Sequence, residues 1–250
     1  MTMLNPELDF TEAMLTLQRT DRVVINNALA TDAAESLYAA LRASVQFNLM
    51  VRDVQGQRAL KNAAADAYAQ GLSSAQQHAA ENFAFAYDGY NLIDAYLSAD
   101  LAYSSTTILR QLVQTLNGTD FLNFARRLTG DKQIRRIDAQ ATRYRAGHFL
   151  LRHNDFSTKE DRRFAYVINL SRHWRADWGG LLQFFDTPSH TTSAEIAMLE
   201  PKIIETICPS FNALTIFKVP QWHCVSPVAT FAKPSDTGGM RLAITGWMQA

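Results

Sequence analysis

The second half of the chain consists of short segments that are rich in β-branched and aromatic residues and are separated by turn residues. Segments of this kind occur in order at residues 134–144, 164–170, 181–185, 203–207, 213–219 and 241–248. Gly and Pro interrupt them, as in Gly179-Gly180 and Pro209-Ser210, which are typical turn signals. No helical run separates them, apart from one turn expected near 193–199. Several short strands at fairly regular spacing predict a β-sandwich, a jelly roll or a barrel.

The first half of the chain has a different composition, because Ala, Leu and Gln predominate there. Helices are expected at 33–44, within 60–85 as one helix or two, at 104–116 and at 119–128. Thr31-Asp32 is typical of a helix start, and Asn117-Gly118 is typical of a helix end. Short strands are expected at 22–26 and 46–51. We expect residues 1–130 to be a mainly helical support for residues 131–250, and the two regions to form one compact unit, because no flexible linker is visible near residue 130.

The charges of the chain cancel, with 24 basic and 24 acidic side chains among 250 residues. This balance excludes a chain-wide basic surface, so direct binding of nucleic acid or anionic lipid is not expected. The two regions have opposite net charges. Residues 1–130 have 9 basic and 13 acidic side chains, whereas residues 131–250 have 15 and 11, together with five of the six histidines. The chemistry is therefore expected in the second region.

The sequence predicts a cytoplasmic protein. The first thirty residues contain no basic segment followed by an apolar run, so no secretory signal is expected. No stretch approaches the roughly eighteen apolar residues of a membrane span. The two cysteines, Cys208 and Cys224, cannot make a disulfide framework and are expected to be buried, reduced thiols rather than metal ligands.

The sharpest local motif is His153-Asn154-Asp155. On or at the end of a strand, residues two apart face the same side, so an imidazole and a carboxylate converge. His223 follows the apolar run 214–219 beyond a turn and is placed to supply a third ligand. Two histidines and one carboxylate form the facial triad of non-haem Fe(II) oxygenases, although the same ligands also hold catalytic zinc. A surface histidine beside a turn-capping aspartate is the competing interpretation, since so short a motif often arises by chance.

Arg241 is the second unusual residue, because it begins an otherwise apolar strand that ends at Trp247. A guanidinium in a core strand is costly without a partner. Facing inward, its planar fork would suit a ligand carboxylate held by two hydrogen bonds. The alternative is an outward-facing arginine at the first position of a strand.

The order and surroundings of these residues resemble the prolyl-4-hydroxylase-like 2-oxoglutarate/Fe(II) dioxygenases. The segments that are similar to the family's metal-binding, central, distal-histidine and co-substrate strands are 144–155, 163–182, 211–226 and 241–247. The resemblance covers residues 134–250 in the right order. It is greatest to the branch of oxygen-sensing and ribosomal-protein prolyl hydroxylases, which use Arg where the collagen-type enzymes use Lys.

The resemblance implies an α+β fold with a mainly β core, namely a double-stranded β-helix (jelly roll, cupin-like) with packed N-terminal helices. It implies that His153, Asp155 and His223 ligate Fe(II), and that Arg241 pairs with the distal carboxylate of 2-oxoglutarate. Tyr144 matches a tyrosine that hydrogen-bonds the co-substrate in relatives, although a structural tyrosine would look the same. No catalytic residue beyond the metal site is required. The co-substrates would be 2-oxoglutarate and O2, with ascorbate as an optional cofactor.

Two departures from the family pattern leave questions open. Asn169 stands where some relatives place a tyrosine that contacts the co-substrate, which leaves the second anchor undetermined. Seventeen residues separate His223 from Arg241, more than in compact relatives, so the loop around 231–239 is expected to shape substrate access.

The implied activity is hydroxylation of a C–H bond of a prolyl residue in a protein or peptide, with release of succinate and CO2. The alternatives are an oxygenase acting on a small metabolite or free amino acid, and a non-catalytic jelly-roll binding module. An arginine-rich stretch at 143–175 is either a docking surface or a set of outward-facing strand positions and solvated loops, and we favour the second. His148, His173 and His190 are expected at the surface or behind the site. The prime substrate, the regiochemistry and the oligomeric state stay open.

Overall fold

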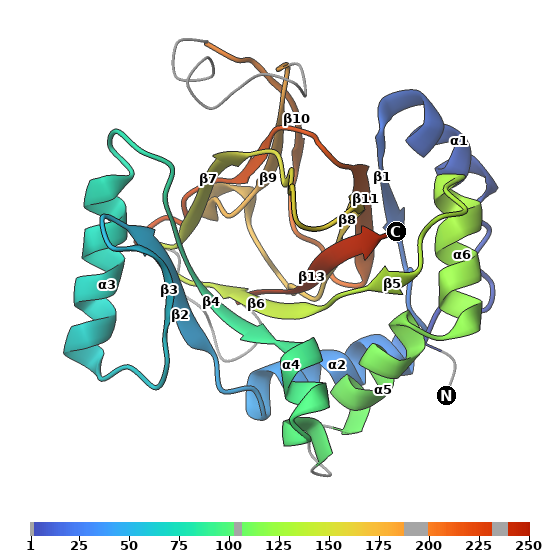
Figure 1. Cartoon of the computed structure of the whole chain (residues 1–250), viewed down its shortest axis with the longest axis horizontal. Helices are drawn as coiled ribbons and strands as arrows, with labels where there is room; N and C mark the ends of the chain where they lie inside the picture. The colour runs from blue at the N-terminus through green and yellow to red at the C-terminus, as the bar shows by residue number, and fades with distance from the viewer. Residues whose placement is uncertain (1–2, 103–106, 188–199, 232–239) are drawn as a thin grey trace.

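The computed structural model describes residues 3–102, 107–187, 200–231 and 240–250. Within these residues thirteen strands form one curled, antiparallel sheet with the order β1-β11-β8-β13-β6-β4-β7-β12-β9-β10 (Figure 1). The remaining strands lie off this path, since β2 pairs with β3 and β4, and β5 pairs with β13. The strands are β1 Arg22–Asn26, β2 Asn48–Asp53, β3 Gly56–Leu60, β4 Phe85–Asn91, β5 Arg136–Ile137, β6 Gln140–Tyr144, β7 Phe149–His153, β8 Arg162–Asn169, β9 Leu182–Phe185, β10 Ile203–Ile207, β11 Ala213–Lys218, β12 His223–Val225 and β13 Arg241–Gln249.

Helices cover the outer face of this sheet, and none of those described is long and apolar enough to cross a membrane. The helices are α1 Thr11–Thr20, α2 Thr31–Ala43, α3 Ala65–His78, α4 Leu92–Leu97, α5 Thr107–Leu116 and α6 Thr119–Thr129, with short 3-10 turns at Asp100–Ala102 and Ala176–Trp178. In Figure 1, α2, α4 and α5 lie below the sheet, α1 and α6 lie at its right side, and α3 packs beside the β2–β3 hairpin. The α+β class predicted from the sequence is confirmed.

Every strand predicted in the second half is present, and the helices at α2, α5 and α6 agree with the prediction. The prediction of one or two helices within 60–85 is confirmed by the single helix α3, which lies between the end of β3 at Leu60 and the start of β4 at Phe85. Gly71 does not break α3, because it is buried where a Cβ would meet the Leu60 side chain at 2.5 Å. The helical turn expected near 193–199 and most of the loop at 231–239 lie outside the described residues.

Strands from both regions share the sheet. β1 pairs with β11 along its whole length, and β4 lies between β6 and β7. These pairings support the proposal that residues 1–130 and 131–250 form one compact unit. Residues 1–130 are less purely helical than the sequence suggested, because four strands come from them.

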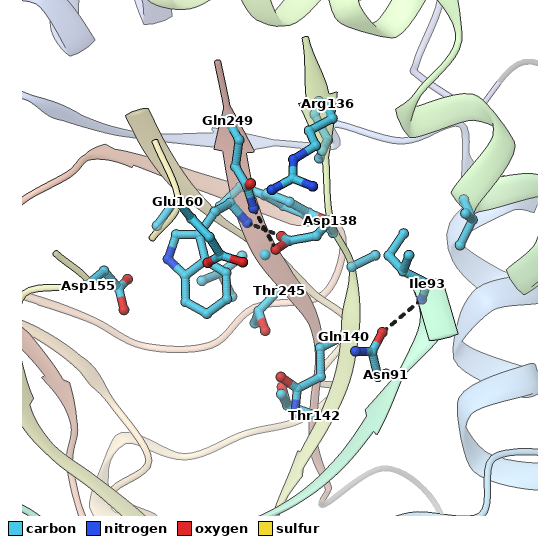
Figure 2. Close-up of a pocket in the computed structure, with 18 of the residues that line it drawn as sticks. Asn91, Ile93, Arg136, Asp138, Gln140, Thr142, Asp155, Glu160, Thr245 and Gln249 are labelled. Carbon is cyan, nitrogen blue, oxygen red and sulfur yellow. Dashed lines mark hydrogen bonds between the residues drawn. The ribbon is translucent and has the colours of Figure 1, made fainter. Parts of the chain in front are cut away.

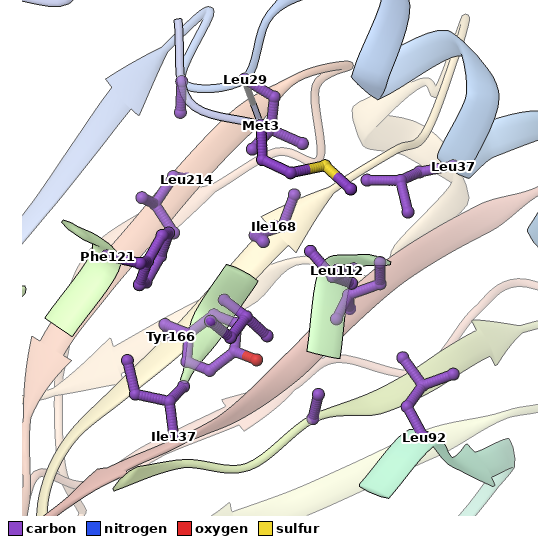
Figure 3. Packing of buried hydrophobic residues seen from close by; sticks show 14 of the residues in the cluster. Met3, Leu29, Leu37, Leu92, Leu112, Phe121, Ile137, Tyr166, Ile168 and Leu214 are labelled. Atoms are coloured by element: carbon purple, nitrogen blue, oxygen red, sulfur yellow. The ribbon is translucent and has the colours of Figure 1, made fainter. Parts of the chain in front are cut away.

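The main hydrophobic core lies between the helices and the outer face of the sheet (Figure 3). Alternate residues of the central strand β8, including Tyr166 and Ile168, point into it and meet Leu37, Leu112 and Phe121 from the helices. The intervening residues Ala165 and Val167 point the other way, into a smaller cluster inside the curl. Such alternation is the ordinary consequence of the strand period of two. The curl therefore has a helix-covered outside and an inside that is free to hold a site.

A buried polar network joins α3 to the sheet behind the site. Asp88 accepts hydrogen bonds from Tyr68 Oη at 2.7 Å and from Arg143 Nε at 2.9 Å. The backbone N–H of Arg145 donates to His148 Nδ1, so the proton of the neutral ring is on Nε2, which contacts Tyr68 Oη at 2.7 Å. Burial lowers the pKa of His148 to about 4, which keeps the ring neutral. His148 is therefore not a surface residue, because it is one of the links that hold α3 in place.

Candidate active site

His153, Asp155 and His223 converge at one point inside the curl. His153 ends β7 and His223 begins β12, and the two residues are direct partners across these antiparallel strands. Asp155 Oδ1 lies 3.3 Å from His153 Nε2, and Asp155 Oδ2 lies 3.5 Å from His223 Nε2. One ligand atom from each residue falls within 4.8 Å of the others, and this is the only such group of metal-ligating side chains among the described residues. His153 and Asp155 are close in the sequence, and the long-range pairing of β7 with β12 adds His223 to them.

The two histidines are oriented by main-chain carbonyls. His153 Nδ1 lies 2.9 Å from Leu151 O, and His223 Nδ1 lies 2.7 Å from Gln221 O. A carbonyl can only accept a hydrogen bond, so each Nδ1 carries a proton and each Nε2 points into the site, where it is the atom that a neutral ring offers to a metal. A second hydrogen bond of this kind fixes ring orientation in metal-binding histidines.

Asp155 reaches the histidines through an uncommon backbone conformation. Its φ is +61°, a left-handed value that Asp tolerates better than most residues and that turns the chain back after β7. Burial raises the pKa of the Asp155 carboxyl, but His223 and His153 lower it, and the net pKa lies below the usual value. Burial and the neighbouring His153 lower the pKa of His223 to about 4. At neutral pH these residues are a carboxylate and a neutral imidazole, which are the forms that bind a metal.

The donor set fits a divalent transition metal. Two imidazole nitrogens and one carboxylate, all from one side, suit Fe(II) and leave positions on the cavity side. The chemistry of the triad therefore fits the Fe(II) ion that the sequence resemblance implied.

Arg241 lies deeper in the same cavity. It is 3% exposed, its Nε donates a hydrogen bond to Gly180 O at 2.6 Å, and its guanidinium lies 4.4 Å from the Tyr144 ring. It has no acidic partner among the described residues. A Cβ at Gly180 would come within 2.9 Å of Arg241 Cδ, which explains the need for glycine at that turn. Arg241 is thus inward-facing, and the alternative of a solvent-exposed strand start is wrong.

Tyr144 packs directly beside Arg241. The two residues are cross-strand partners between β6 and β13, and Tyr144 also stacks on Tyr87 with 5.4 Å between ring centroids. Both rings line the cavity. Burial raises the pKa of Tyr144, so its hydroxyl stays protonated and is available as a hydrogen-bond donor.

A cavity of about 790 Å³ connects these residues. Its lining includes the triad and Arg241, then Gln140, Thr142 and Thr245 on the inner face of β6 and β13, and residues of α4 and α5. Figure 2 shows Gln140, Thr142 and Thr245 between Asp155 and Ile93 of α4. Other charged and apolar side chains also line the cavity, namely Ile93, Asp94 and Leu97 of α4, and Arg136, Asp138 and Glu160. The sequence did not single out these residues, although the alternation of Gln140, Thr142 and Tyr144 is a strand signal that places them on one face.

Several other predictions can now be compared with the structure. Cys224 is buried as expected, but Cys208 is exposed. The arginines at 143–175 are largely engaged within the chain: Arg163 pairs with Asp131, and Arg172 pairs with Glu35. This agrees with the interpretation of that stretch as ordinary strand and loop positions. Trp247 lines the cavity.

Comparison with known proteins agrees with this geometry. Residues 139–249 match the family model of the 2OG-Fe(II) oxygenase superfamily. Prolyl 3-hydroxylase OGFOD1 from Mus musculus is 33% identical over 131 residues, which is 51% of this chain and 21% of the mouse protein. The Xenopus laevis protein of the same name is 28% identical over 130 residues, or 51% of this chain and 22% of that protein. The match thus spans only about a fifth of the length of these curated relatives.

Solved structures extend the similarity of fold to almost the whole chain. A Pseudomonas putida prolyl-4-hydroxylase covers 96% of this chain and 99% of its own, with a TM-score of 0.52 and 17% identity. A Trichoplax adhaerens prolyl hydroxylase, solved with a hypoxia inducible factor oxygen degradation domain peptide fragment, covers 95% of this chain and 87% of its own, with a TM-score of 0.52 and 17% identity. These matches confirm the predicted double-stranded β-helix with packed N-terminal helices.

A curled antiparallel sheet holds a His-Asp-His triad whose donors suit a non-haem Fe(II) site. Residues 139–249 are similar to the 2OG-Fe(II) oxygenase superfamily, and the chain is similar to proteins named prolyl hydroxylases.

Proposed function

We propose that the protein is an Fe(II)- and 2-oxoglutarate-dependent dioxygenase that hydroxylates a prolyl residue of a protein or peptide. One observation carries the proposal. Two imidazole Nε2 atoms and a carboxylate meet at one place in a cavity, and the same cavity is lined by a buried arginine that has no acidic partner among the described residues.

The triad His153, Asp155 and His223 would hold Fe(II). When bound, Fe(II) supplies the oxygen-activating chemistry that couples decarboxylation of 2-oxoglutarate to succinate with hydroxylation of a C–H bond. The protein's part is to hold the ligands in one orientation, which the carbonyls of Leu151 and Gln221 do by fixing both rings.

Arg241 would bind the distal carboxylate of 2-oxoglutarate, since a guanidinium offers two parallel donors to a carboxylate. Tyr144 supports that role in two ways. Its ring holds the guanidinium in place at 4.4 Å, and its protonated hydroxyl can donate to the same co-substrate. Leu182, Phe217 and Val225 give this part of the cavity apolar walls that exclude water.

The part of the cavity that is lined by α4 and α5 would receive the prime substrate. A cavity of about 790 Å³ has room for more than a five-carbon dicarboxylate, and its outer part presents amide, charged and apolar groups of the kind that bind a peptide. The similarity to proteins named prolyl hydroxylases supports proline as the target. A cytoplasmic site of action belongs to the same proposal and is compatible with the two free thiols.

Anaerobic titration with Fe(II) and then 2-oxoglutarate tests the cofactor assignment. The wild-type protein should develop the weak visible charge-transfer band of the chelate, and His153→Ala should not. His78→Ala, which changes a histidine at the end of α3, is the matched control and should keep the band. Absence of the band from the wild type would contradict the assignment.

Incubation of the aerobic protein with a cell lysate, followed by mass spectrometry, tests the substrate. Peptides that gain one oxygen on proline, only with 2-oxoglutarate present, would support prolyl hydroxylation. Oxidation of a small metabolite with no modified peptide would instead favour the metabolite oxygenase.

A further inference from the structure

Asp155 lies in a segment that none of the described strands pairs with. β7 ends at His153 and β8 begins at Arg162, so Asp155 belongs to the connection between them. Its φ of +61° is unfavourable for a residue other than glycine, and such a conformation persists only where neighbouring groups enforce it. Because the carboxylate reaches the two histidines through this backbone conformation, the contacts that hold it bear on metal binding.

A β-bulge places Arg162 on the same face of the sheet as Trp247. Between Met248 and Gln249 of β13 the register shifts, and β8 has one extra residue, Arg163, at that point. Bulges of this kind redirect side chains and are common beside active sites. Arg162 is the direct partner of Gln249 and therefore shares its face, on which Trp247 also lies and lines the cavity.

The Arg162 guanidinium makes three contacts. Its Nη1 donates a hydrogen bond to the backbone carbonyl oxygen of Asp155 at 3.3 Å. Its central carbon lies over the Trp247 ring, 3.6 Å from the ring centroid. Its Nε and Nη2 lie 2.9 and 2.7 Å from Glu160 Oε2. The Arg162 side chain is only 20% exposed, so these contacts are largely shielded from solvent.

Trp247 gives the guanidinium a rigid support, because it belongs to the central strand β13. Its backbone N–H donates to the Asp138 carboxylate, which also accepts a hydrogen bond from Gln249 Nε2 at 2.9 Å. A guanidinium over a tryptophan ring is attracted by the negative face of the ring. A continuous series of contacts thus leads from β13 through Arg162 to the backbone of Asp155.

We propose that Arg162 is a positioning residue for the metal site. Held on the Trp247 ring, it fixes the backbone of Asp155 in the conformation that delivers the carboxylate to the metal. This inference rests on the metal site of the proposed function. An ion pair between Arg162 and Glu160 that served the surface alone would leave metal affinity unchanged, so the two roles can be separated by measurement.

The test measures binding of Mn(II) alone, which accepts nitrogen and oxygen ligands but binds more weakly than Fe(II). Its dissociation constant is obtained from the electron paramagnetic resonance signal of the free ion. The variants are Arg162→Met, Trp247→Leu, Trp247→Phe and the double variant Arg162→Met/Trp247→Leu. Arg163→Met is the matched control, because it changes the adjacent arginine, which pairs with Asp131 directly after α6.

Loss of a group that orients a metal ligand typically weakens metal binding about 10–100-fold, so the Mn(II) dissociation constant of Arg162→Met should rise at least about 10-fold. Trp247→Leu should act in the same direction, and Trp247→Phe should recover most of the loss because it keeps an aromatic face. The double variant should bind about as weakly as the weaker single variant, since both changes remove one contact. Arg163→Met should stay within about 2-fold of the wild type.

An unchanged dissociation constant in Arg162→Met would overturn the proposal. So would an equal rise in Arg163→Met, which would mean that loss of either arginine loosens the region. The proposal also fails if Trp247→Phe binds no better than Trp247→Leu, or if the losses of the two single variants multiply in the double variant. In each case a wild type that binds Mn(II) leaves the proposed function standing, whereas a wild type that does not bind it removes both.

Discussion

Replacing Arg241 by methionine should separate co-substrate binding from folding. Methionine is of similar length and has no charge, so the substitution removes a buried guanidinium while keeping most of the packing. Within the chain this guanidinium has the Gly180 carbonyl and the Tyr144 ring as its contacts, and no acidic partner among the described residues. The effects on stability and on binding can therefore be estimated separately.

The effects on stability largely cancel. Losing a hydrogen bond from a charged group costs about 1.5–3 kcal/mol, and losing the contact with the ring costs up to about 2 kcal/mol. The substitution also removes the cost of burying an incompletely paired charge, and this gain offsets several kcal/mol of those losses. We expect the free energy of unfolding without 2-oxoglutarate to change by about 1 kcal/mol or less, which moves Tm by roughly 2–4 °C in a chain of this size.

The loss of binding free energy for 2-oxoglutarate has no compensating gain. Removing one partner of a buried, hydrogen-bonded charge pair costs about 2–5 kcal/mol, so the Kd for 2-oxoglutarate should rise about 30-fold or more. At a concentration of about 100 times the wild-type Kd, binding stabilises the wild type by about 2.7 kcal/mol but the variant by less than about 1 kcal/mol. Expressed as Tm, the wild-type shift is roughly 5–11 °C.

Anaerobic thermal unfolding with Fe(II), with and without 2-oxoglutarate, measures both quantities. Arg175→Met is the control, because Arg175 is mostly exposed and paired with Asp177, and this variant should show the full wild-type shift. An Arg241→Met protein that keeps the full shift would refute the carboxylate assignment. A variant that loses more than about 10 °C without 2-oxoglutarate would refute the view that Arg241 contributes little to the fold.

Three further outcomes are expected. Asp155→Asn should abolish the Fe(II)–2-oxoglutarate band while keeping the far-ultraviolet circular dichroism spectrum, and a retained band would remove Asp155 from the metal site. Asp53→Asn should lower the free energy of unfolding by about 2 kcal/mol at pH 7, because Asp53 is buried and bonded to Arg58 and Ser74; since the folded pKa of Asp53 is depressed well below 3.8, the wild-type advantage should begin to shrink as the pH falls below about 4 and should vanish only below the folded pKa, and urea titrations at pH 7 and pH 3 that give the same difference would contradict this. Leu112→Ala should cost about 2–5 kcal/mol in urea unfolding, because Leu112 is fully buried between α5 and the sheet, and a cost below about 1 kcal/mol would mean that the helix layer packs loosely there.

Local sequence patterns were sufficient to predict most strands of the second half of the chain. Strands such as β8 and β13 could be predicted because each has β-branched residues, period-two alternation and turn residues at its ends. In the first half the sequence did not predict β3. The β2–β3 hairpin depends on Gly56 at φ +89°, and β3 itself has no apolar alternation that marks it as a strand.

The metal ligands could be predicted only in part from spacing. His153 and Asp155 are two residues apart, so local geometry brings them together, whereas His223 joins them only through pairing of β12 with β7. For His148 the sequence left two places open, the surface or behind the site, and the structure places it behind the site. Its burial depends on Tyr68 of α3 and Asp88 of β4, which lie 80 and 60 residues earlier, and no local pattern reports such contacts.

The position of β13 has a consequence for how the protein acquires its structure. This strand is the last of those described, yet it lies in the middle of the sheet, between β8 and β6. During synthesis β6 and β8 must therefore wait, with one edge each unpaired, until residues 241–249 leave the ribosome. Exposed edges of this kind favour association with other chains. Newly made protein is therefore prone to such association until β13 inserts, and the part of the cavity around Arg241 forms only then.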